Sequence, residues 1–464
     1  MRLSELLKNG DFYGDFDPET EITGVCSRLD RCEKGSLFIA VSGSRFDGAA
    51  HLEEAFARGA GAVVTEKEIH GKNIVKCKNV LSAFSGICAA ENGEPQKKLT
   101  LIGLTGTNGK TTTSYICSRI LNSAGIKTEI VGSVNFENTT PEPPVFFSAL
   151  GDIAERGTKA VVCEVSSQGL DQHRVDPCRF RVGVFLNFGT DHLDYHGTPA
   201  SYFECKKKLK TLSDIFAVNG DDRHTASLIS DGVKSFSLFS GGDYVAANVS
   251  ETADGSRFSL LHNGTETPVS IGLVGIYNVY NALAALTVSC ELGVPETVAA
   301  KALEKPLRIP GRMEKIGTNA PFSVYVDYAH TPQALATALR TLRARTKGRL
   351  IAVFGCGGDR DREKRPEMGK QAALFADEII VTSDNPRTED PDEIIKDILS
   401  GADKRRFTVV PDRRSAIGVA LDAAREGDCV IIAGKGHEKY QIVGKKKLPF
   451  DDAETAAEML RRYE

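Results

Sequence analysis

Short apolar runs and longer helical stretches alternate along the middle of the chain. The runs LTLIGLTG (residues 99–106), AVVCEV (160–165) and VGVFLNF (182–188) are strand-like, whereas TTTSYICSRILNSAG (111–125) has a helical pattern. Short apolar runs bounded by turn residues are typical of buried strands. Strands that alternate with helices predict a mainly parallel sheet, because parallel strands need a crossover connection.

The same alternation returns in the last third of the chain. A strand-like run, VYVDYAH (324–330), precedes the helical stretch PQALATALRTLRA (332–344), and three more such runs follow: RLIAVFG (349–355), EIIVTS (378–383) and CVIIAG (429–434). Loops rich in Gly, Asp, Asn or Arg come directly after these three runs. Because ligands of doubly wound sheets bind at the carboxyl ends of the strands, we expect a ligand site there.

The first part of the chain has a similar but shorter pattern. Strand-like GSLFIAV (35–41) and GAVVTE (61–66) flank the helical stretch HLEEAFARGA (51–60). The polar stretch ENGEPQKK (91–98) follows and is typical of a linker.

Length and composition indicate a globular protein of several domains. The chain has 464 residues, of which 41% are hydrophobic and 26% charged, and such a length exceeds one ordinary core. We therefore expect an α/β fold with three domains, at residues 1–96, 97–311 and 312–464.

Charge and cysteine usage exclude some partners and compartments. The net charge of −4 and the absence of a basic tail argue against nucleic acid. The N-terminus has no apolar signal-peptide core, and no apolar run approaches the roughly 20 residues that span a bilayer. The 11 cysteines show no CxxC and no zinc-like spacing, so we expect reduced thiols and a cytoplasmic protein that does not bind membranes.

A glycine-rich turn in the middle segment has the features of a phosphate-binding loop. It lies between a predicted strand and a predicted helix and comprises Gly106, Thr107, Asn108, Gly109, Lys110, Thr111 and Thr112. Glycines let backbone N–H groups approach phosphate, Lys110 can reach the terminal phosphates, and the Thr111 hydroxyl can bind Mg²⁺. Position 104 is Leu104, so the loop has the shorter G-x-x-G-K-T form. The alternative is a tight strand–helix turn with an exposed lysine.

Acidic and imidazole groups follow the next two predicted strands. Glu164 ends one strand and could hold Mg²⁺, although a strand-capping glutamate is the alternative. Asn187 and the run Asp191-His192-Leu193-Asp194-Tyr195-His196 follow the other strand. An isolated histidine is more often a satisfied surface or core residue, but two histidines with two aspartates at a strand end favour a site.

One lysine of the next predicted helix is expected to point inward. Tyr202, Lys206 and Leu209 share a helix face because they are spaced three or four residues apart. Lys207, Lys208 and Lys210 then face solvent, which is the usual place for a run of charges.

These motifs together resemble the Mur ligase family, and within it the MurE-type enzymes. The resemblance extends from Ser27 to Asp452 and includes GTNGKTTT, NTTP, EVSSQGLDQHRV, NFGTDHLDYHG, GIYNVYNALAAL, PGRMEKI, VDYAHTP, FGCGGDRD, SDNPR and GKGHEKYQ. It implies an N-terminal UDP-sugar-binding domain, a central ATP-binding domain with a mainly parallel sheet, and a C-terminal, Rossmann-like amino-acid-binding domain. Gln168 departs from the histidine of many relatives, which affects only a detail of its loop.

The resemblance also implies roles for individual residues. Those expected to bind the UDP-MurNAc-dipeptide are Val25, Ser27, Ser44, Arg45, Phe46, Asn138, Thr139, Thr140, Ser166, Gln172 and Arg174. Asn278, Arg312 and Asp327 are expected to join the glycine-rich loop in binding ATP. Lys206 matches a lysine that CO₂ carboxylates, and its carbamate would bind metal with Thr111, Glu164 and His192. Lys110, Lys206 and His192 are the expected catalytic residues.

The C-terminal strand ends resemble the DNPR loop of MurE-type enzymes that add meso-diaminopimelate. The residues concerned are Arg360, Asp384, Asn385, Pro386, Arg387, Gly434 and Glu438. An arginine fork suits the extra carboxylate of diaminopimelate, and carboxylates or carbonyls suit an ammonium. Two alternatives stay open: Arg387 could cap its own loop, and the amino acid could be L-lysine or another diamino acid.

The resemblance implies an ATP- and Mg²⁺-dependent ligation through an acyl phosphate. The expected acceptor is UDP-MurNAc-L-Ala-D-Glu, and we expect the enzyme to be a monomer that serves peptidoglycan precursor synthesis. Three other functions are alternatives: a Mur-type ligase with a longer peptide or folate-type acceptor, a non-catalytic nucleotide-gated binding module, and a P-loop transport ATPase. The DNPR loop opposes the first, the retained Lys110, Glu164 and Lys206 oppose the second, and the loop spacing opposes the third.

Overall fold

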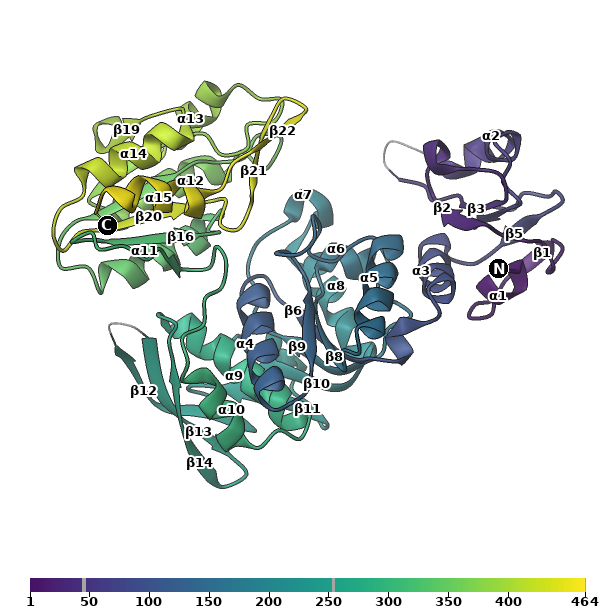
Figure 1. Cartoon of the computed structure of the whole chain (residues 1–464), viewed down its shortest axis with the longest axis horizontal. Coiled ribbons are helices and arrows are strands. Elements are labelled where there is room, and N and C mark those ends of the chain that lie inside the picture. Colours follow the sequence, from purple (N-terminus) through teal and green to yellow (C-terminus); the bar gives the residue numbers. More distant parts are fainter. Residues whose placement is uncertain (44–46, 253–254, 464) are drawn as a thin grey trace. The chain divides into compact units, whose positions relative to one another are not determined.

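The computed structural model describes residues 1–43, 47–252 and 255–463, which form two compact units (Figure 1). The first unit comprises Met1–Val249, Phe258–Ser270 and Tyr277–Lys305. The second comprises Ser250–Arg257, Ile271–Ile276 and Pro306–Glu464.

The first unit begins with a five-stranded sheet. Its elements are α1 (Leu3–Leu6), β1 (Tyr13–Asp15), β2 (Gly24–Cys26), η1 (Leu29–Arg31), β3 (Ser36–Ile39), η2 (Gly48–His51), α2 (Leu52–Ala57), β4 (Ala62–Thr65), β5 (Ile74–Lys76) and α3 (Val80–Glu91). The strand order is β1-β5-β4-β3-β2, in which β1 is antiparallel to β5 and the other neighbours are parallel. β3 and β4 are buried along their whole length, as expected for apolar strands covered on both faces.

The polar stretch after α3 is packed against the protein rather than extended. It contains the short turn η3 (Pro95–Lys97), in which Pro95 and Gln96 are buried. The stretch is therefore not loosely exposed along its whole length, and its role as a linker between domains stays a prediction.

A nine-stranded sheet follows. Its strands and helices are β6 (Thr100–Thr105), α4 (Lys110–Ser123), β7 (Thr128–Val131), α5 (Pro143–Glu155), β8 (Ala160–Glu164), α6 (Ser167–Asp171), β9 (Phe180–Phe185), α7 (Leu193–His196), α8 (Pro199–Thr211), β10 (Ser213–Asn219), η4 (Thr225–Leu228), β11 (Val233–Ser237), β12 (Tyr244–Thr252), β13 (Gly255–His262), β14 (Thr265–Ile271), α9 (Ile276–Glu291) and α10 (Glu296–Leu303). The order is β14-β13-β12-β11-β10-β9-β6-β8-β7, and the strands from β7 to β12 pair in parallel. β6 lies between β9 and β8, so the loop after it opens on the carboxyl edge between the loops that follow β9 and β8.

The second unit has a six-stranded sheet. Its elements are β15 (Glu314–Lys315), β16 (Ser323–Asp327), α11 (Pro332–Arg343), β17 (Leu350–Phe354), α12 (Lys364–Phe375), β18 (Glu378–Val381), α13 (Pro391–Leu399), η5 (Lys404–Arg406), β19 (Phe407–Val409), α14 (Arg413–Ala423), β20 (Cys429–Ala433), β21 (Tyr440–Val443), β22 (Lys446–Pro449), α15 (Asp452–Leu460) and η6 (Arg461–Tyr463). The order is β15-β16-β20-β17-β18-β19, with only β15 antiparallel to its neighbour. β21 and β22 form a separate hairpin.

Helix α11 shows how the sequence specifies these elements. Thr331 accepts a hydrogen bond from the backbone of Ala334 at its N-terminus, and Pro332 is its first residue. Leu335, Leu339 and Leu342 are buried at spacings of four and three, which places them on one face. Each buried leucine contributes about 1.5–3 kcal/mol relative to an exposed one.

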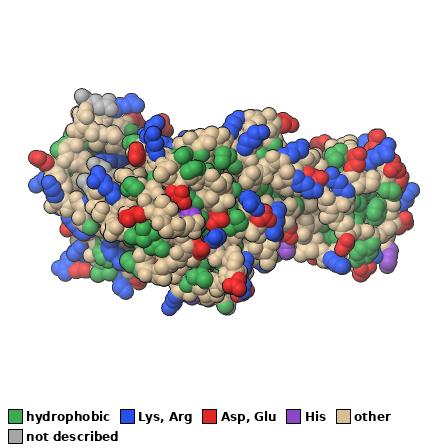
Figure 2. Space-filling model, turned by 90° about the horizontal axis from the view of Figure 1, so that it is seen from below, with side chains coloured by type: hydrophobic (Ala, Val, Ile, Leu, Met, Phe, Trp, Pro, Cys, Tyr) green, Lys and Arg blue, Asp and Glu red, His purple; other side chains and the backbone are tan. Residues whose placement is uncertain are grey.

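The α/β fold with mainly parallel sheets is confirmed, and each strand named from the sequence is present. Strands β12 to β14, at residues 244–271, had no counterpart among the predicted elements. The domain boundaries after residues 96 and 311 stay predictions. On the face drawn in Figure 2, basic and acidic side chains are interspersed.

Candidate active site

The glycine-rich turn lies between β6 and α4. Gly106 and Gly109 have φ of 151° and 88°, backbone conformations that residues with a side chain rarely adopt. A Cβ atom on Gly109 would lie 2.3 Å from Oδ1 of Asn281. Glycine is therefore required at this position both by the backbone and by the neighbouring helix α9.

Lys110 is the first residue of α4 and folds back over the turn. Its Nζ donates to the carbonyl oxygens of Gly106, at 2.7 Å, and Thr107, at 3.1 Å. The other side of the turn is held by Asn187, whose Oδ1 accepts from the backbone N–H of Asn108 at 2.9 Å. This geometry is that of an anion-binding turn at a helix N-terminus, with a lysine beside it.

Glu164, at the end of β8, is 1% exposed and lies against the start of α4. Its Oε2 accepts from the hydroxyls of Thr111, at 3.0 Å, and Ser133, at 3.1 Å. A Cβ atom on Gly132 would lie 2.2 Å from Oε1. Two hydroxyls and a carboxylate form an all-oxygen donor set, which fits Mg²⁺. The sequence indicated Thr111 and Glu164 but not Ser133.

Four residues predicted to bind the acceptor form one connected group beside Glu164. Thr140 donates to the carbonyl oxygen of Glu164 at 2.9 Å and accepts from the backbone N–H of Ser166 at 2.8 Å. The guanidinium of Arg174 donates to the carbonyl oxygen of Thr140 at 2.5 Å and to Oε1 of Gln172 at 2.6 Å.

The remaining predicted acceptor residues have other contacts or lie outside the described residues. Thr139 is 3.0 Å from the Ser133 hydroxyl, whereas Asn138 is exposed. Val25 donates its backbone N–H to Glu91 at 3.0 Å, and Ser27 is half-buried. Ser44, Arg45 and Phe46 lie outside the described residues.

Helix α8 presents Lys206 inward, as the sequence predicted. Lys206 is 1% exposed, as is Tyr202, and its Nζ donates to the carbonyl oxygen of Gly106 at 3.0 Å. The ammonium also lies 4.6 Å from the centre of the Tyr202 ring. Within the described residues, no carboxylate forms an ion pair with it. Burial, followed by the nearby charge of Lys110, holds the pKa of Lys206 well below its usual range.

The histidines after β9 gather around Tyr202. The rings of His192 and His196 lie 6.1 and 5.1 Å from the Tyr202 ring, measured between centroids. His192 has φ of 53° and lies 3.6 Å from the carboxylate of Asp191, and His196 lies 2.9 Å from the Ser167 hydroxyl. The cluster predicted at this strand end is present, and its role in binding metal stays a prediction.

The residues predicted to contact ATP outside the loop lie in both units. Asn278, in the first unit, is buried and accepts from Nδ2 of Asn281 at 3.0 Å, which connects it to the turn at Gly109. In the second unit, Asp327 accepts from the backbone N–H of Met313 at 2.7 Å. Burial raises the pKa of Asp327, against the opposing effects of that N–H and of Arg312. The Arg312 guanidinium stacks 4.4 Å from the centre of the Tyr328 ring.

In the second unit, the loops after β18 and β20 meet around one buried ammonium. Lys435 is 0% exposed, and its Nζ lies 3.0 Å from Glu438 and 3.1 Å from Oδ1 of Asn385. Nδ2 of Asn385 donates to Glu438 at 2.8 Å, and a Cβ atom on Gly434 would lie 2.6 Å from Asp384. The predicted Asp384, Asn385, Gly434 and Glu438 are thus brought together. Lys435 was missed, although it stands inside the motif GKGHEKYQ.

Two arginines lie close to Gly357, near the backbone of Asn385. A Cβ atom on Gly357 would lie 2.9 Å from Nη1 of Arg387 and 3.8 Å from Cγ of Arg360, so the two arginines flank this glycine. Nη1 of Arg387 donates to the carbonyl oxygens of Gly358, at 2.8 Å, and Asn385, at 3.4 Å.

Arg387 therefore caps its own loop in part, as the alternative expected. In the part of the chain that the structure describes, neither arginine has an ion pair with a carboxylate. Burial, followed by the charge of Arg360, lowers the pKa of Arg387.

A buried ion pair holds these loops in place, and the sequence did not indicate it. Arg413 and Asp452 are both 0% exposed at their side chains and lie 2.7 Å apart. Arg413 also donates to the carbonyl oxygens of Ala433, at 3.0 Å, and Ser383, at 3.4 Å. It therefore ties the end of β20 to the residue before Asp384.

The fold and the glycine-rich turn define a nucleotide-binding α/β protein, and comparison with known proteins gives the family. The Mur ligase middle domain matches residues 104–289, and the Mur ligase glutamate ligase domain matches residues 311–436. The chain belongs to the Mur ligase family.

Curated relatives match along the whole chain. UDP-N-acetylmuramoyl-L-alanyl-D-glutamate–2,6-diaminopimelate ligase of Caldanaerobacter subterraneus subsp. tengcongensis is 38% identical, with 100% of both chains covered. The Aquifex aeolicus protein of the same name is 41% identical, over 95% of this chain and 94% of its own.

Solved structures agree on the fold. A ligase structure with that same name has a TM-score of 0.70 at 32% identity and covers 100% of this chain and 99% of its own. MurF ligase of Thermotoga maritima in complex with ADP has a TM-score of 0.66 at 21% identity, covers 96% of this chain and 98% of its own, and shares the fold. None of the described helices is long and apolar enough to cross a membrane.

Proposed function

We propose that this chain is an ATP-dependent ligase that joins meso-diaminopimelate to the D-glutamate carboxylate of UDP-MurNAc-L-Ala-D-Glu. The relatives reported above are named as 2,6-diaminopimelate ligases, and this chain matches them over nearly their full length. We further propose that it acts as a monomer in the cytoplasm, in peptidoglycan precursor synthesis.

One observation carries the choice of amino acid. Arg387 has Arg360 as a neighbour, and neither has an ion pair with a carboxylate among the described residues, while Glu438 and Asp384 lie close to the adjoining Asn385 and Lys435. A diamino acid with two carboxylates offers an anion to the arginines and an ammonium to the acidic side. L-Lysine lacks the second carboxylate and would leave the half-buried Arg387 without an anion, which favours diaminopimelate.

The glycine-rich turn would bind the phosphates of ATP through its backbone N–H groups, with Lys110 donating to the terminal phosphates. Thr111, Ser133 and Glu164 would hold Mg²⁺, which offsets negative charge on the phosphoryl group. Lys110 donates to two backbone carbonyls of the turn, so its ammonium already lies at the loop proposed to bind the phosphates.

Lys206 is proposed to react with CO₂. Its neutral amine would add to CO₂ and release one proton, which gives a carbamate anion in place of a cation. Deep burial and the lack of an ion pair with a described carboxylate support this reaction, because both disfavour the ammonium. The carbamate would add an oxygen ligand for a cation near Gly106, with His192 as a further ligand.

The connected group of Thr140, Ser166, Gln172 and Arg174 is proposed to hold the acceptor. The γ-phosphoryl group passes from ATP to the D-glutamate carboxylate, which leaves ADP and an acyl phosphate. The amine of diaminopimelate attacks the acyl carbon, loses a proton and expels inorganic phosphate. Positioning and electrostatic stabilisation supply most of the rate enhancement.

The test is amino-acid-dependent phosphate release. Purified protein is given ATP, Mg²⁺ and UDP-MurNAc-L-Ala-D-Glu, and meso-diaminopimelate, L-lysine and L-ornithine are compared. We expect phosphate release and tripeptide formation with diaminopimelate at a kcat/KM at least about 100-fold above that with L-lysine. Equal or faster use of L-lysine would contradict the assignment of the amino acid, and ATP binding without product from any diamino acid would contradict ligation itself.

A further inference from the structure

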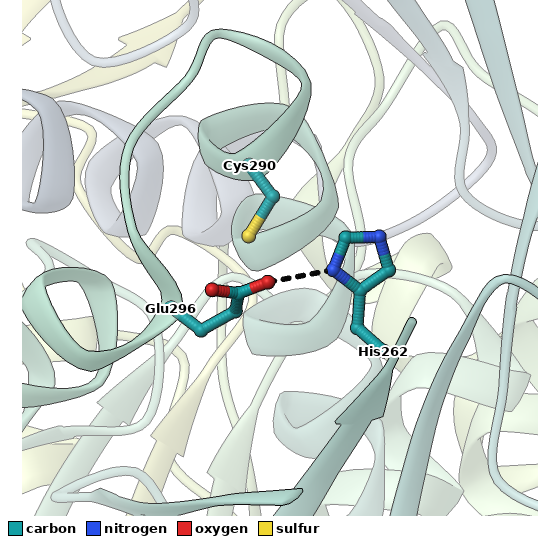
Figure 3. A group of neighbouring side chains, drawn as sticks. All are labelled: His262, Cys290 and Glu296. Atoms are coloured by element: carbon teal, nitrogen blue, oxygen red, sulfur yellow. Dashed lines mark hydrogen bonds and ion pairs between the residues drawn. The ribbon is translucent and has the colours of Figure 1, made fainter. Parts of the chain in front are cut away.

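Three side chains with metal-binding atoms converge in the first unit, outside the site described above. They are His262 at the end of β13, Cys290 near the end of α9 and Glu296 at the start of α10 (Figure 3). Cys290 is nine residues beyond Asn281 on α9, which places it about 13 Å along the helix from the glycine-rich turn.

The three ligand atoms are already close. The imidazole nitrogen, the sulfur and a carboxylate oxygen all lie within 4.8 Å of one another, and Nδ1 of His262 is 2.7 Å from Oε1 of Glu296. Ligands of a tetrahedral zinc ion, at bond lengths of about 2.0–2.3 Å, lie about 3.4 Å apart. Small side-chain rotations would bring the three atoms to that spacing.

The surroundings fix the imidazole and leave the group accessible. The His262 ring stacks on Tyr244 with centroids 4.1 Å apart and an angle of 17° between the planes. The Tyr244 hydroxyl in turn donates to Glu291 at 2.8 Å. The side chains of His262 and Glu296 are 11% and 27% exposed, so an ion can reach them from solvent. A second layer of contacts of this kind orients metal ligands.

We propose that His262, Cys290 and Glu296 bind one Zn²⁺ ion, with water as the fourth ligand. A thiolate, an imidazole and a carboxylate suit a borderline-soft cation, whereas Mg²⁺ prefers oxygen ligands alone. On binding, the Cys290 thiol releases its proton to solvent. The neutral His262 ring changes tautomer: the proton that Nδ1 shares with Glu296 is released to solvent, another is taken up at Nε2, and Nδ1 then binds the metal. The ion would join β13, α9 and α10 and stabilise the first unit.

Cobalt substitution tests this site in the full chain. Metal-free protein is titrated with Co²⁺, because a cobalt–thiolate bond gives a near-ultraviolet charge-transfer band that oxygen ligands near Glu164 do not give. We expect the band to saturate at one Co²⁺ per chain and to disappear when Zn²⁺ is added. Absence of the band would overturn the proposal, since His262 and Glu296 would then form only an ion pair.

Variants assign the band to these residues. Cys290→Ser should abolish it, and His262→Gln should weaken Co²⁺ binding at least about tenfold. His51→Gln is the matched control, because His51 also pairs with a glutamate, at 3.4 Å, but at an exposed position. A band that persists in Cys290→Ser would overturn the proposal by placing the metal on another cysteine.

A measurement on the unmodified chain keeps the test valid if a variant fails to fold. Bound Zn²⁺ should slow alkylation of Cys290 at least about tenfold, as read by peptide mass spectrometry, because the metal occupies the sulfur lone pair. Zn²⁺ should also raise the Tm of the chain. Equal alkylation of Cys290 with and without Zn²⁺ would overturn the proposal.

Discussion

Lys206 and Lys435, which lie in different units, are equally buried, but among the described residues only Lys435 has carboxylates within ion-pair distance of its ammonium. Lys206 is 1% exposed, and its Nζ donates to one backbone carbonyl, with no ion pair to a carboxylate among the described residues. Lys435 is 0% exposed, and its Nζ lies 3.0 Å from Glu438 and 4.0 Å from Asp384. Burial disfavours the charged form of an amine, and a nearby carboxylate favours it. Burial alone therefore does not determine what a lysine does.

The two lysines are therefore suited to different roles in the candidate site. Lys206 is suited to being a neutral amine that gains a negative charge from CO₂, near a turn that binds phosphates. Lys435 is suited to being a fixed cation that orients Asn385 and Glu438. The same substitution at the two positions should consequently have different effects on activity and opposite effects on stability.

The largest effect is expected from Lys206→Ala. Loss of the carbamate removes a proposed metal ligand, so kcat should fall about 1000-fold or more. Phosphate release under saturating substrates measures it. Formate or acetate should restore part of the activity, because a small carboxylate can occupy the space of the carbamate.

Lys208→Ala is the matched control on the same helix. Lys208 is exposed and lies 3.5 Å from Asp171, so its loss should change kcat less than about twofold. Activity of Lys206→Ala close to that of the control would refute the proposed carbamate.

Lys435→Met should have the next largest effect, on stability. It leaves Glu438, whose side chain is 18% exposed, beside Asp384 and Asn385 without its cation, and breaking a buried pair costs about 3–5 kcal/mol. Calorimetry should show a lower Tm, whereas Lys439→Met, at an exposed position, should change stability by less than about 0.5 kcal/mol.

A double variant separates the ion pair from general packing. Glu438→Gln added to Lys435→Met removes the unpaired charge and should recover at least about half of the lost stability. If the two losses simply add, Lys435 and Glu438 are not coupled, and the contrast with Lys206 fails.

Arg387→Ala tests recognition in the second unit. The kcat/KM for diaminopimelate should fall about 10- to 100-fold, because one charged hydrogen-bond donor to the substrate is lost. The KM for ATP should stay within about twofold. Arg387 has φ of 54°, and alanine bears the same backbone cost there as arginine, so the change reports on the side chain.

Arg414→Ala, which removes an exposed arginine paired with Glu458, is the control for this measurement. An equal loss for diaminopimelate and L-lysine would indicate that Arg387 only maintains its loop through Gly358 and Asn385.

The sequence predicted those parts of the site that lie in continuous motifs. The turn at Gly106–Thr112 was readable because strand, glycines, lysine and threonine stand in one run. The inward face of α8 was readable from helical spacing, and Tyr202, Lys206 and Leu209 are indeed buried. In both cases the physical cause is local, so the order of residues is sufficient.

Contacts between distant segments were not readable. Ser133 meets Glu164 from 31 positions away, and Arg413 meets Asp452 from 39 positions away. Lys435 stood inside a recognised motif, but its role depends on Asn385, which belongs to another strand end. Such pairs depend on how distant segments are arranged in space, and the arrangements of the nine-stranded and six-stranded sheets are not encoded in any local pattern.

Gly109→Ala should have a smaller effect, on the phosphate-binding side. The new methyl group would adopt φ of 88° and lie 2.3 Å from Asn281, so the turn must shift. We expect the KM for ATP to rise about tenfold, from roughly 1–2 kcal/mol of strain. Gly125→Ala shares the positive φ, at 83°, but meets open space, so it should leave the KM for ATP unchanged. Equal KM values for the two variants would mean that crowding by Asn281 does not shape the turn.

The smallest effect is the most direct test of the contrast between the two lysines. Lys206→Met should stabilise the chain by about 1 kcal/mol at pH 7 in CO₂-depleted buffer, since functional groups often cost stability. The folded-state pKa of Lys206 lies below its usual value, so the unfolded chain binds the extra proton and wild-type stability rises with pH.

The gain from Lys206→Met should therefore shrink as pH rises toward 10, and Tm measured from pH 7 to pH 10 follows it. Lys435→Met should lower Tm throughout that range, because it removes the ammonium that contacts Glu438 and Asn385. A loss of stability in both variants at pH 7 would show that Lys206 is held as a compensated cation after all.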